Sequence, residues 1–249
     1  GHTCLPRDKL LDSTARFLRV PPEAIEEGLE ELLSAEELRS RTFDGVEYIY
    51  LPDLLSAEED IAARLGQLST FPTPRTLDAD IRALELAQCF AYAPLQKQAI
   101  RLALSSRVMV LTGGPGTGKT TTVNAILSLY EALYDRVALC APTGRAAKRL
   151  SELTHHAAST IHRLLEVDYS SGNVRFIHNE KNLLKYDVII LDEMSMVDVK
   201  LFQALLAAAR YHCRIIMVGD ADQLPSVGPG NILGEILRAD VVPTVRLTD

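Results

Sequence analysis

The sequence of 249 residues has few cysteines, no long apolar run and no leader-like start. No apolar stretch approaches the roughly 18 residues that a membrane-spanning helix needs, so we expect no membrane segment. Gly1-His2-Thr3 shows neither a Met nor a signal pattern, and we therefore expect a fragment whose native N-terminus is missing. The four cysteines include no CxxC pair, and a chain of this length buries a core without disulfides. We interpret them as reduced thiols of a cytoplasmic protein.

The composition is that of a globular protein. Apolar residues make up 47% and charged residues 24%, which excludes disorder, collagen and coiled coil as the main class. The charge is uneven, because residues 1–80 contain 17 acidic and 8 basic side chains, whereas residues 81–249 contain 16 and 18. This difference predicts two units. The net charge of -7 argues against a nucleic-acid binder that relies on bulk attraction, but it is compatible with a local basic groove.

The N-terminal part, residues 1–70, predicts a small α+β domain. Apolar residues recur at helical spacing before and after Pro21-Pro22, which predicts two helices. Alternation around Asp44-Gly45 predicts a hairpin, and Ser56 with Glu59 forms a capping box that predicts a helix from there to about residue 68. This order is typical of a winged-helix-like domain, and a generic helical accessory domain is the alternative.

The remaining part, residues 71–249, begins with a proline-punctuated linker at 71–76 and then predicts an α/β lobe. After two helices, at about 78–90 and 95–105, short apolar runs alternate with helical patterns. Continuous apolar runs are typical of parallel strands buried on both faces, so we expect a parallel sheet. The runs are VMVL (108–111), VALC (137–140), VIIL (188–191) and IIMV (215–218). The turn signal Ser171-Gly172-Asn173 predicts an inserted hairpin near 167–183.

A phosphate-binding loop follows the first of these runs. Residues 113–120 read GGPGTGKT and fit G-x-x-x-x-G-K-[ST] between a predicted strand and a predicted helix, which is the context that this motif requires. The glycines let backbone N–H groups converge on phosphate oxygens at the helix start. We expect Lys119 to reach the β- and γ-phosphates and Thr120 to ligate Mg²⁺. The expected ATP-binding set here is Gly113, Gly114, Pro115, Gly116, Thr117, Gly118, Lys119, Thr120 and Thr121.

Two further segments predict catalytic residues beside Lys119. Asp192-Glu193 ends the VIIL run, where P-loop enzymes place the acidic residue that holds Mg²⁺. We therefore expect Asp192 at the metal and Glu193 as the base that deprotonates water. The segment GDADQLP at 219–225 follows the last run, and parallel strands end at one edge of a sheet, so we expect Gln223 to sense the γ-phosphate.

Five sequence segments follow one another in the same order as the motifs of a known protein family. GGPGTGKTTT, CAPTGRAAKRL, ASTIHRLL, LDEMSM and GDADQLPSVGPGNIL resemble motifs I, Ia, Ib, II and III of superfamily 1 helicases, specifically of the RecD/TraA branch, over about residues 90–249. The resemblance implies a RecA-like P-loop NTPase lobe and an ATP-driven DNA helicase that moves 5′ to 3′ on single-stranded DNA. It also implies that Gln96 reads the adenine edge, with Gln98 as a nearby competitor.

The resemblance further implies a path for single-stranded DNA. The expected DNA-binding residues are Pro142, Thr143, Gly144 and Arg145 from motif Ia, and Thr160 and His162 from motif Ib. Contacts of this kind go to phosphates and carry no sequence information. The cluster of Arg145, Lys148, Arg149 and Arg163 is either a DNA contact or a solvated face, and His162 is either on the path or a packed helix residue.

The family's motor has two RecA-like lobes, and the second one is not expected within these residues. We expect an accessory domain plus the first lobe (1A), with Arg246 in the last segment of that lobe and with near-background ATP hydrolysis in isolation, because the catalytic arginines would come from the second lobe. The alternatives are another P-loop ATPase or a non-catalytic nucleotide- or DNA-binding scaffold. The sequence contains no nuclease motif, so DNA cleavage is not expected.

Overall fold

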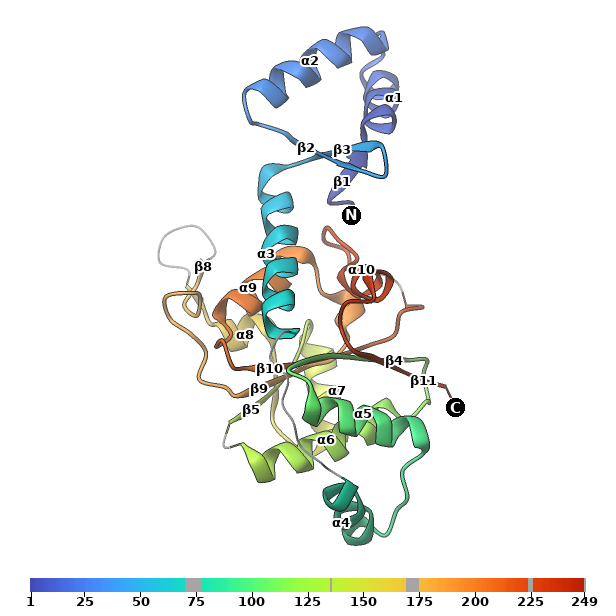
Figure 1. Cartoon of the computed structure of the whole chain (residues 1–249). Helices are drawn as coiled ribbons and strands as arrows, with labels where there is room; N and C mark the ends of the chain where they lie inside the picture. Colours follow the sequence, from blue (N-terminus) through green and yellow to red (C-terminus); the bar gives the residue numbers. More distant parts are fainter. Residues whose placement is uncertain (70–77, 135, 169–174, 224–225, 249) are drawn as a thin grey trace.

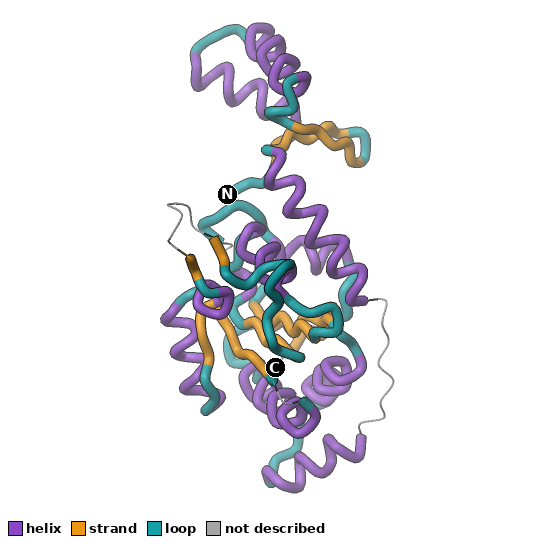
Figure 2. Tube along the Cα trace, turned by 90° about the vertical axis from the view of Figure 1, so that its left-hand side faces the viewer, coloured by secondary structure: helices purple, strands orange, loops and turns teal. Residues whose placement is uncertain are grey.

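The computed structural model describes residues 1–69, 78–134, 136–168, 175–223 and 226–248. It shows a small N-terminal unit and a larger α/β body (Figure 1). In both views the N-terminal unit stands above the body, and helix α3 (Pro52–Ser69) leads from one to the other (Figures 1 and 2).

The N-terminal unit combines two helices with a three-stranded antiparallel sheet of order β1-β3-β2. Its elements are β1 (Cys4–Pro6), α1 (Arg7–Leu18), α2 (Pro22–Ser34), β2 (Arg39–Phe43) and β3 (Val46–Tyr50). Asp44 and Gly45 join β2 to β3 with φ values of 49° and 79°, the left-handed pair that a tight hairpin turn requires. The two helices and the hairpin are confirmed. Strand β1 has only three residues, too few to show a two-residue period, and the winged-helix assignment stays a prediction.

Helix α3 begins at Pro52, earlier than the capping box predicts. The prediction of a start at Ser56 is wrong, since Ser56 and Glu59 both lie inside the helix. Leu54 and Leu55 are buried, so the apolar face that stabilises α3 starts before the capping box and carries the helix with it.

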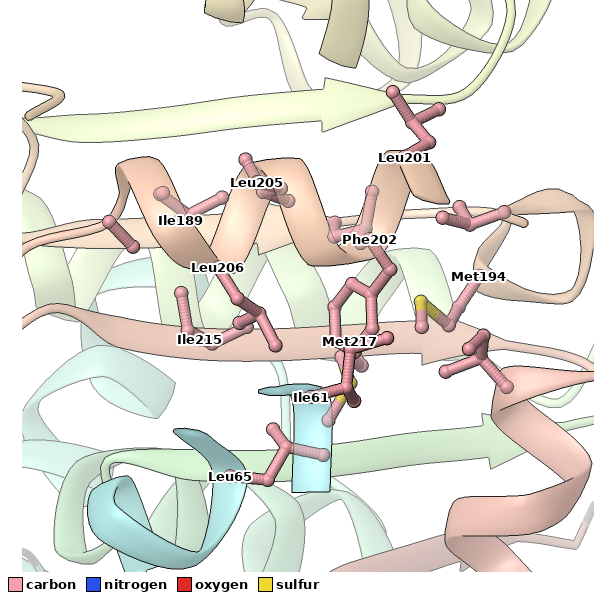
Figure 3. Packing of buried hydrophobic residues seen from close by; sticks show 14 of the residues in the cluster. Ile61, Leu65, Ile189, Met194, Leu201, Phe202, Leu205, Leu206, Ile215 and Met217 are labelled. Carbon is pink, nitrogen blue, oxygen red and sulfur yellow. The ribbon is translucent and has the colours of Figure 1, made fainter. Parts of the chain in front are cut away.

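The buried face of α3 belongs to the core of the body. Ile61 and Leu65 join the same apolar cluster as Phe202 of helix α9 (Val199–Ala208) and Met217 of the central sheet (Figure 3). Burying each such side chain stabilises the fold by roughly 1.5–3 kcal/mol. The division at residue 70 stays a prediction, and the core on this side of the sheet includes side chains from before and after it.

A six-stranded parallel sheet of order β11-β4-β10-β9-β5-β6 forms the centre of the body, which confirms the predicted α/β fold. The strands are β4 (Val108–Gly113), β5 (Val137–Ala141), β6 (Ala158–Thr160), β9 (Val188–Leu191), β10 (Arg214–Gly219) and β11 (Thr244–Leu247). The four predicted apolar runs are the four inner strands. The edge strands β6 and β11 are short and mix polar with apolar residues, so they show no continuous run.

Helices cover both faces of the sheet (Figures 1 and 2). One face packs against α4 (Asp78–Gln88), α5 (Pro94–Ser105), α6 (Lys119–Leu133) and α7 (Gly144–Thr154). The other packs against α3, α8 (Ile161–Leu165), α9 and α10 (Ile232–Ala239). Burial on both faces is the reason that the inner strands are continuously apolar.

A small hairpin precedes β9. Strand β7 (Val167–Asp168) pairs antiparallel with β8 (Arg175–Phe176), in the region where the sequence predicts an insertion. The turn signal Ser171-Gly172-Asn173 lies outside the described residues. Among the described residues, every helix is too short or too polar to span a lipid bilayer.

Candidate nucleotide site and nucleic-acid interface

The carboxyl ends of the parallel strands bring the predicted motifs to one edge of the sheet. Thr112 of β4 pairs with Gly219 of β10, and Leu191 of β9 pairs with both Met217 and Cys140 of its neighbours. Next to them, Ala141 of β5 pairs with Thr160 of β6. The segments after these residues, at 113–120, 142–145, 160–163, 192–193 and 220–223, therefore share this edge, where open α/β sheets bind ligands.

The predicted phosphate loop connects β4 to α6 as one tight turn. Gly116 and Gly118 each have a φ of 82°, a left-handed conformation that other residues adopt only with strain. Thr117 Oγ1 donates to the Gly114 carbonyl at 2.9 Å, and Lys119 Nζ donates to the carbonyls of Gly113 and Gly114 at 2.6 Å each. Pro115 is exposed, and Thr120 and Thr121 lie in the first turn of α6. The whole predicted set is thus contiguous at a helix N-terminus.

The loop fits a phosphate group. A Cβ at Gly116 would meet nothing within 4 Å, and one at Gly114 would meet only Thr117 at 4.0 Å, so space is open beside the loop. A Cβ at Gly113, by contrast, would lie 2.8 Å from the Leu247 carbonyl oxygen. Lys119 contacts two carbonyl oxygens without formal charge, so an anion at this helix N-terminus would compete for its ammonium group.

Gln96 lies directly behind the phosphate loop. It is only 9% exposed, its Nε2 donates to the Gly118 carbonyl at 3.4 Å, and its Oε1 accepts from the Ala93 backbone N–H at 2.9 Å. The side chain therefore both caps α5 and contacts the start of α6. Gln98 is exposed and, two residues further along α5, lies on a different side of that helix from Gln96.

Asp192 and Glu193 follow β9 at the same edge. The Asp192 backbone N–H donates to Cys140 at 2.9 Å, and its Oδ1 accepts from the Glu193 N–H at 2.9 Å. Glu193 has a φ of 54°, an uncommon conformation for a residue with a Cβ. The 3-10 helix η1 (Met194–Met196) follows, so the chain turns sharply at the acidic pair, directly after β9 ends.

Burial raises the pKa of the Asp192 carboxyl to about 6, and the charge of Glu193 acts in the same direction. The N–H of Glu193 and the charges of Lys119 and Arg149 oppose this rise in the pKa. A desolvated carboxylate beside a second one fits a divalent cation, because the cation would supply the positive charge that these carboxylates need.

The loop at 220–223, called the sensor loop here, follows β10. Asp220 is buried, its Oδ1 accepts from the Asp222 N–H at 3.0 Å, and its carbonyl accepts from the Gln223 N–H at 3.3 Å. Ser195 Oγ donates to Gln223 Oε1 at 3.5 Å, which connects the sensor loop to η1. The sequence predicts no role for Ser195, whose only signal is its place in LDEMSM.

The predicted DNA-binding residues begin two helices. Thr143 caps α7, with Oγ1 accepting from Ala146 N–H at 3.2 Å, and Thr160 caps α8, with Oγ1 accepting from Arg163 N–H at 3.1 Å. Pro142 is half-buried, while Gly144, Arg145, Lys148, Arg149, His162 and Arg163 are exposed. The His162 ring lies 5.8 Å from the Phe176 ring of the inserted hairpin, so His162 packs on one side and remains open to solvent.

Several known proteins are similar to this chain in amino-acid sequence. A family model described as AAA domain matches residues 96–229. The ATP-dependent RecD2 DNA helicase of Deinococcus radiodurans is 37% identical across 100% of this chain and 35% of its own length. The RecBCD enzyme subunit RecD of Mycobacterium tuberculosis is 41% identical across 76% of this chain and 36% of its own length. The chain thus spans about a third of these relatives.

Among solved structures, the Pif1 helicase from Candida albicans has a TM-score of 0.48 and 22% identity over 64% of this chain and 40% of its own. The AAA-domain match from 96 to 229 covers more than half of the chain and contains the phosphate loop, the acidic pair and the sensor loop. The chain therefore belongs to the AAA-domain family, and its sequence is similar to those of the RecD-type relatives.

Proposed function

We propose that this chain binds ATP with Mg²⁺ and forms the first motor lobe, with an accessory domain, of a DNA helicase that moves 5′ to 3′ on single-stranded DNA. The observation that carries the proposal is the convergence of the phosphate loop, the acidic pair and the sensor loop at one sheet edge. The RecD-type relatives support the DNA part, and the direction of movement comes from the family resemblance alone. We also propose a cytoplasmic location, because the four cysteines are free thiols and the cytoplasm keeps thiols reduced.

The phosphate loop and Gln96 hold the nucleotide in this proposal. Backbone N–H groups of the loop residues other than Pro115, which has none, surround the phosphate oxygens, and Lys119 exchanges its carbonyl partners for the β- and γ-phosphates. Gln96 reads the adenine edge in this proposal, and its contact with the loop at Gly118 supports that role. Thr120 and Asp192 would hold Mg²⁺, which neutralises phosphate charge when bound.

Glu193 and Gln223 act on the reaction rather than on binding. Glu193 orients and deprotonates the attacking water, because it is the carboxylate beside the metal-side residue Asp192. Gln223 contacts the γ-phosphate from the sensor loop. Arginines of a second lobe would be needed for fast hydrolysis, and such residues raise the rate by about 10³–10⁵. We therefore expect hydrolysis by residues 1–249 to be close to background.

Single-stranded DNA crosses the starts of α7 and α8. Thr143 and Thr160 each use an oxygen lone pair for the helix cap, which leaves the hydroxyl hydrogen to donate to a phosphate. Gly144 exposes the backbone, Pro142 shapes the turn, and Arg145 and His162 face solvent beside them. Contacts of this kind predict binding that is indifferent to base sequence and falls with salt.

Nucleotide titration with a fluorescent ADP tests the proposal. Wild type should bind in the presence of Mg²⁺, and Lys119→Ala should lose most of that affinity while it keeps its affinity for single-stranded DNA. Lys185→Ala is the control for loss of a lysine charge, because Lys185 is exposed and precedes β9, at the amino end of the strand, whereas the phosphate loop lies at the carboxyl ends. Equal affinity of all three proteins for ADP would contradict the proposal and favour a non-catalytic scaffold.

A further inference from the structure

Arg246 lies on the edge strand next to the phosphate loop. Strand β11 pairs with β4 so that Arg246 is opposite Thr112 and Leu247 is opposite Gly113, the first residue of the loop. Thr112 is in turn opposite Gly219, which ends β10. Arg246, Thr112 and Gly219 therefore form one row across three strands, and neighbouring strands lie about 4.8 Å apart. An arginine side chain is long enough to cross β4 toward the loop that follows Gly219.

An ion pair makes that crossing. The guanidinium of Arg246 lies 3.1 Å from Asp222 Oδ2, and the two side chains are 61% and 77% exposed. Asp222 precedes Gln223, and both of their N–H groups donate to Asp220, so the sensor loop is a compact turn. An interaction that restrains Asp222 therefore also restrains the position of Gln223.

A second contact orients the end of the Gln223 side chain. Ser195 Oγ donates to Oε1 of Gln223 at 3.5 Å, and Ser195 itself is only 7% exposed. With its oxygen turned to Ser195, the amide presents its N–H₂ group as the donor, which is the group that an anionic phosphate needs. Ser195 thus fixes the orientation of the amide, while the Arg246–Asp222 pair fixes the backbone that carries it.

We propose that Arg246 is a positioning residue: its ion pair with Asp222 holds the sensor loop beside the phosphate loop, so that the chain binds nucleoside triphosphates more tightly than diphosphates. This inference rests on the proposed function, since it assigns the γ-phosphate to Gln223. Arg246 touches Asp222 and acts through it on the nucleotide. The α- and β-phosphates are bound by the phosphate loop, so ADP affinity does not depend on the pair.

The size of the effect is limited by the strength of the pair. An exposed ion pair is weak, and it can transmit no more to the nucleotide than its own free energy, which corresponds to at most about a fivefold change in a dissociation constant. For the same reason its loss should lower the thermal midpoint by no more than about 2–4 °C. Weaker triphosphate binding with unchanged ADP binding would therefore report positioning, because a general loss of stability would weaken both.

The test compares the dissociation constants of ADP and of a non-hydrolysable ATP analogue for the 249-residue chain with Mg²⁺. Arg246→Gln and Asp222→Asn should each weaken the analogue by about three- to fivefold and leave ADP unchanged. The exchanged pair, Arg246→Asp with Asp222→Arg, should return to within about twofold of wild type. Arg101→Gln is the matched control, because Arg101 also forms an exposed ion pair, with Asp78 at 2.7 Å, and this pair joins α5 to α4 rather than contacting the sensor loop.

Each outcome decides the matter. Unchanged analogue affinity in Arg246→Gln, or an equal loss of ADP and analogue, would overturn the role of Arg246. A loss in Arg101→Gln of the same size would show a general charge effect and would overturn it as well. Wild type that binds neither nucleotide would instead refute the proposed function, so the two failures are distinguishable.

Discussion

Substitutions at Thr143 can separate its role as a helix cap from its proposed role in DNA binding. Oγ1 accepts a hydrogen bond from the Ala146 N–H at 3.2 Å, which caps α7, and in our proposal the hydroxyl hydrogen donates to a DNA phosphate. Thr143→Ala removes both interactions and Thr143→Ser keeps both. Thr143→Asp keeps an acceptor for the cap but has no donor and repels phosphate.

The expected magnitudes follow from these contacts. Loss of an N-cap side chain costs about 1 kcal/mol, which lowers the thermal midpoint of a chain of this size by about 2–4 °C. A hydrogen bond to a charged phosphate is worth at least about 1.4 kcal/mol, or roughly tenfold in affinity. Thr143→Ala should therefore lower both the thermal midpoint and the DNA affinity. Thr143→Asp should lower only the DNA affinity, and Thr143→Ser should lower neither.

Thermal unfolding and fluorescence anisotropy with a labelled single-stranded oligonucleotide give the two readouts. A salt titration adds a control, because Thr143 carries no charge and its loss should leave the salt dependence unchanged. Arg145→Ala should lower the slope of log K against log salt by about 0.7. If Thr143→Asp melts as early as Thr143→Ala, the cap assignment is wrong. If Thr143→Ala binds DNA like wild type, Thr143 is a helix cap and no more.

Three further predictions concern the sheet edge and the core. Without nucleotide, the raised pKa of Asp192, about 6, means that its protonated form stabilises the fold; this contribution is complete below the unfolded pKa of 3.8 and is lost as pH rises through about 6. Asp192→Asn should therefore raise the free energy of unfolding at pH 7 by on the order of 2 kcal/mol and flatten its pH dependence in denaturant titrations. Gly113→Ala should destabilise the fold by about 1–3 kcal/mol, because its Cβ would lie 2.8 Å from the Leu247 carbonyl oxygen, whereas Gly114→Ala should unfold at nearly the wild-type denaturant concentration. Arg214→Met should cost about 2–4 kcal/mol, since Arg214 is 6% exposed and its guanidinium makes three hydrogen bonds, and ADP affinity should not change.

The sequence was sufficient for features whose cause is local. The phosphate loop depends on glycines that permit left-handed φ values and on a helix start, both of which lie within residues 113–120. The four inner strands can be predicted from the sequence because burial on both faces makes each one continuously apolar. The hairpin at Asp44-Gly45 is likewise a short-range effect of turn chemistry.

Only the tertiary structure decided features whose cause lies far along the chain. Helix α3 starts at Pro52 rather than Ser56 because its apolar face packs on α9, well over a hundred residues later in the chain. The residues around Pro52 do not by themselves predict that packing. The pairing of Arg246 with Asp222 requires β11 to lie beside β4 and β10 on its other side, an order that hydrophobic pattern does not encode. Likewise, LDEMSM shows that Ser195 follows the acidic pair, but only the fold brings its hydroxyl to Gln223. Local backbone conformation and the burial of a strand can be predicted from neighbouring residues. Contacts across a sheet depend instead on strand order, which is determined by the packing of the whole chain.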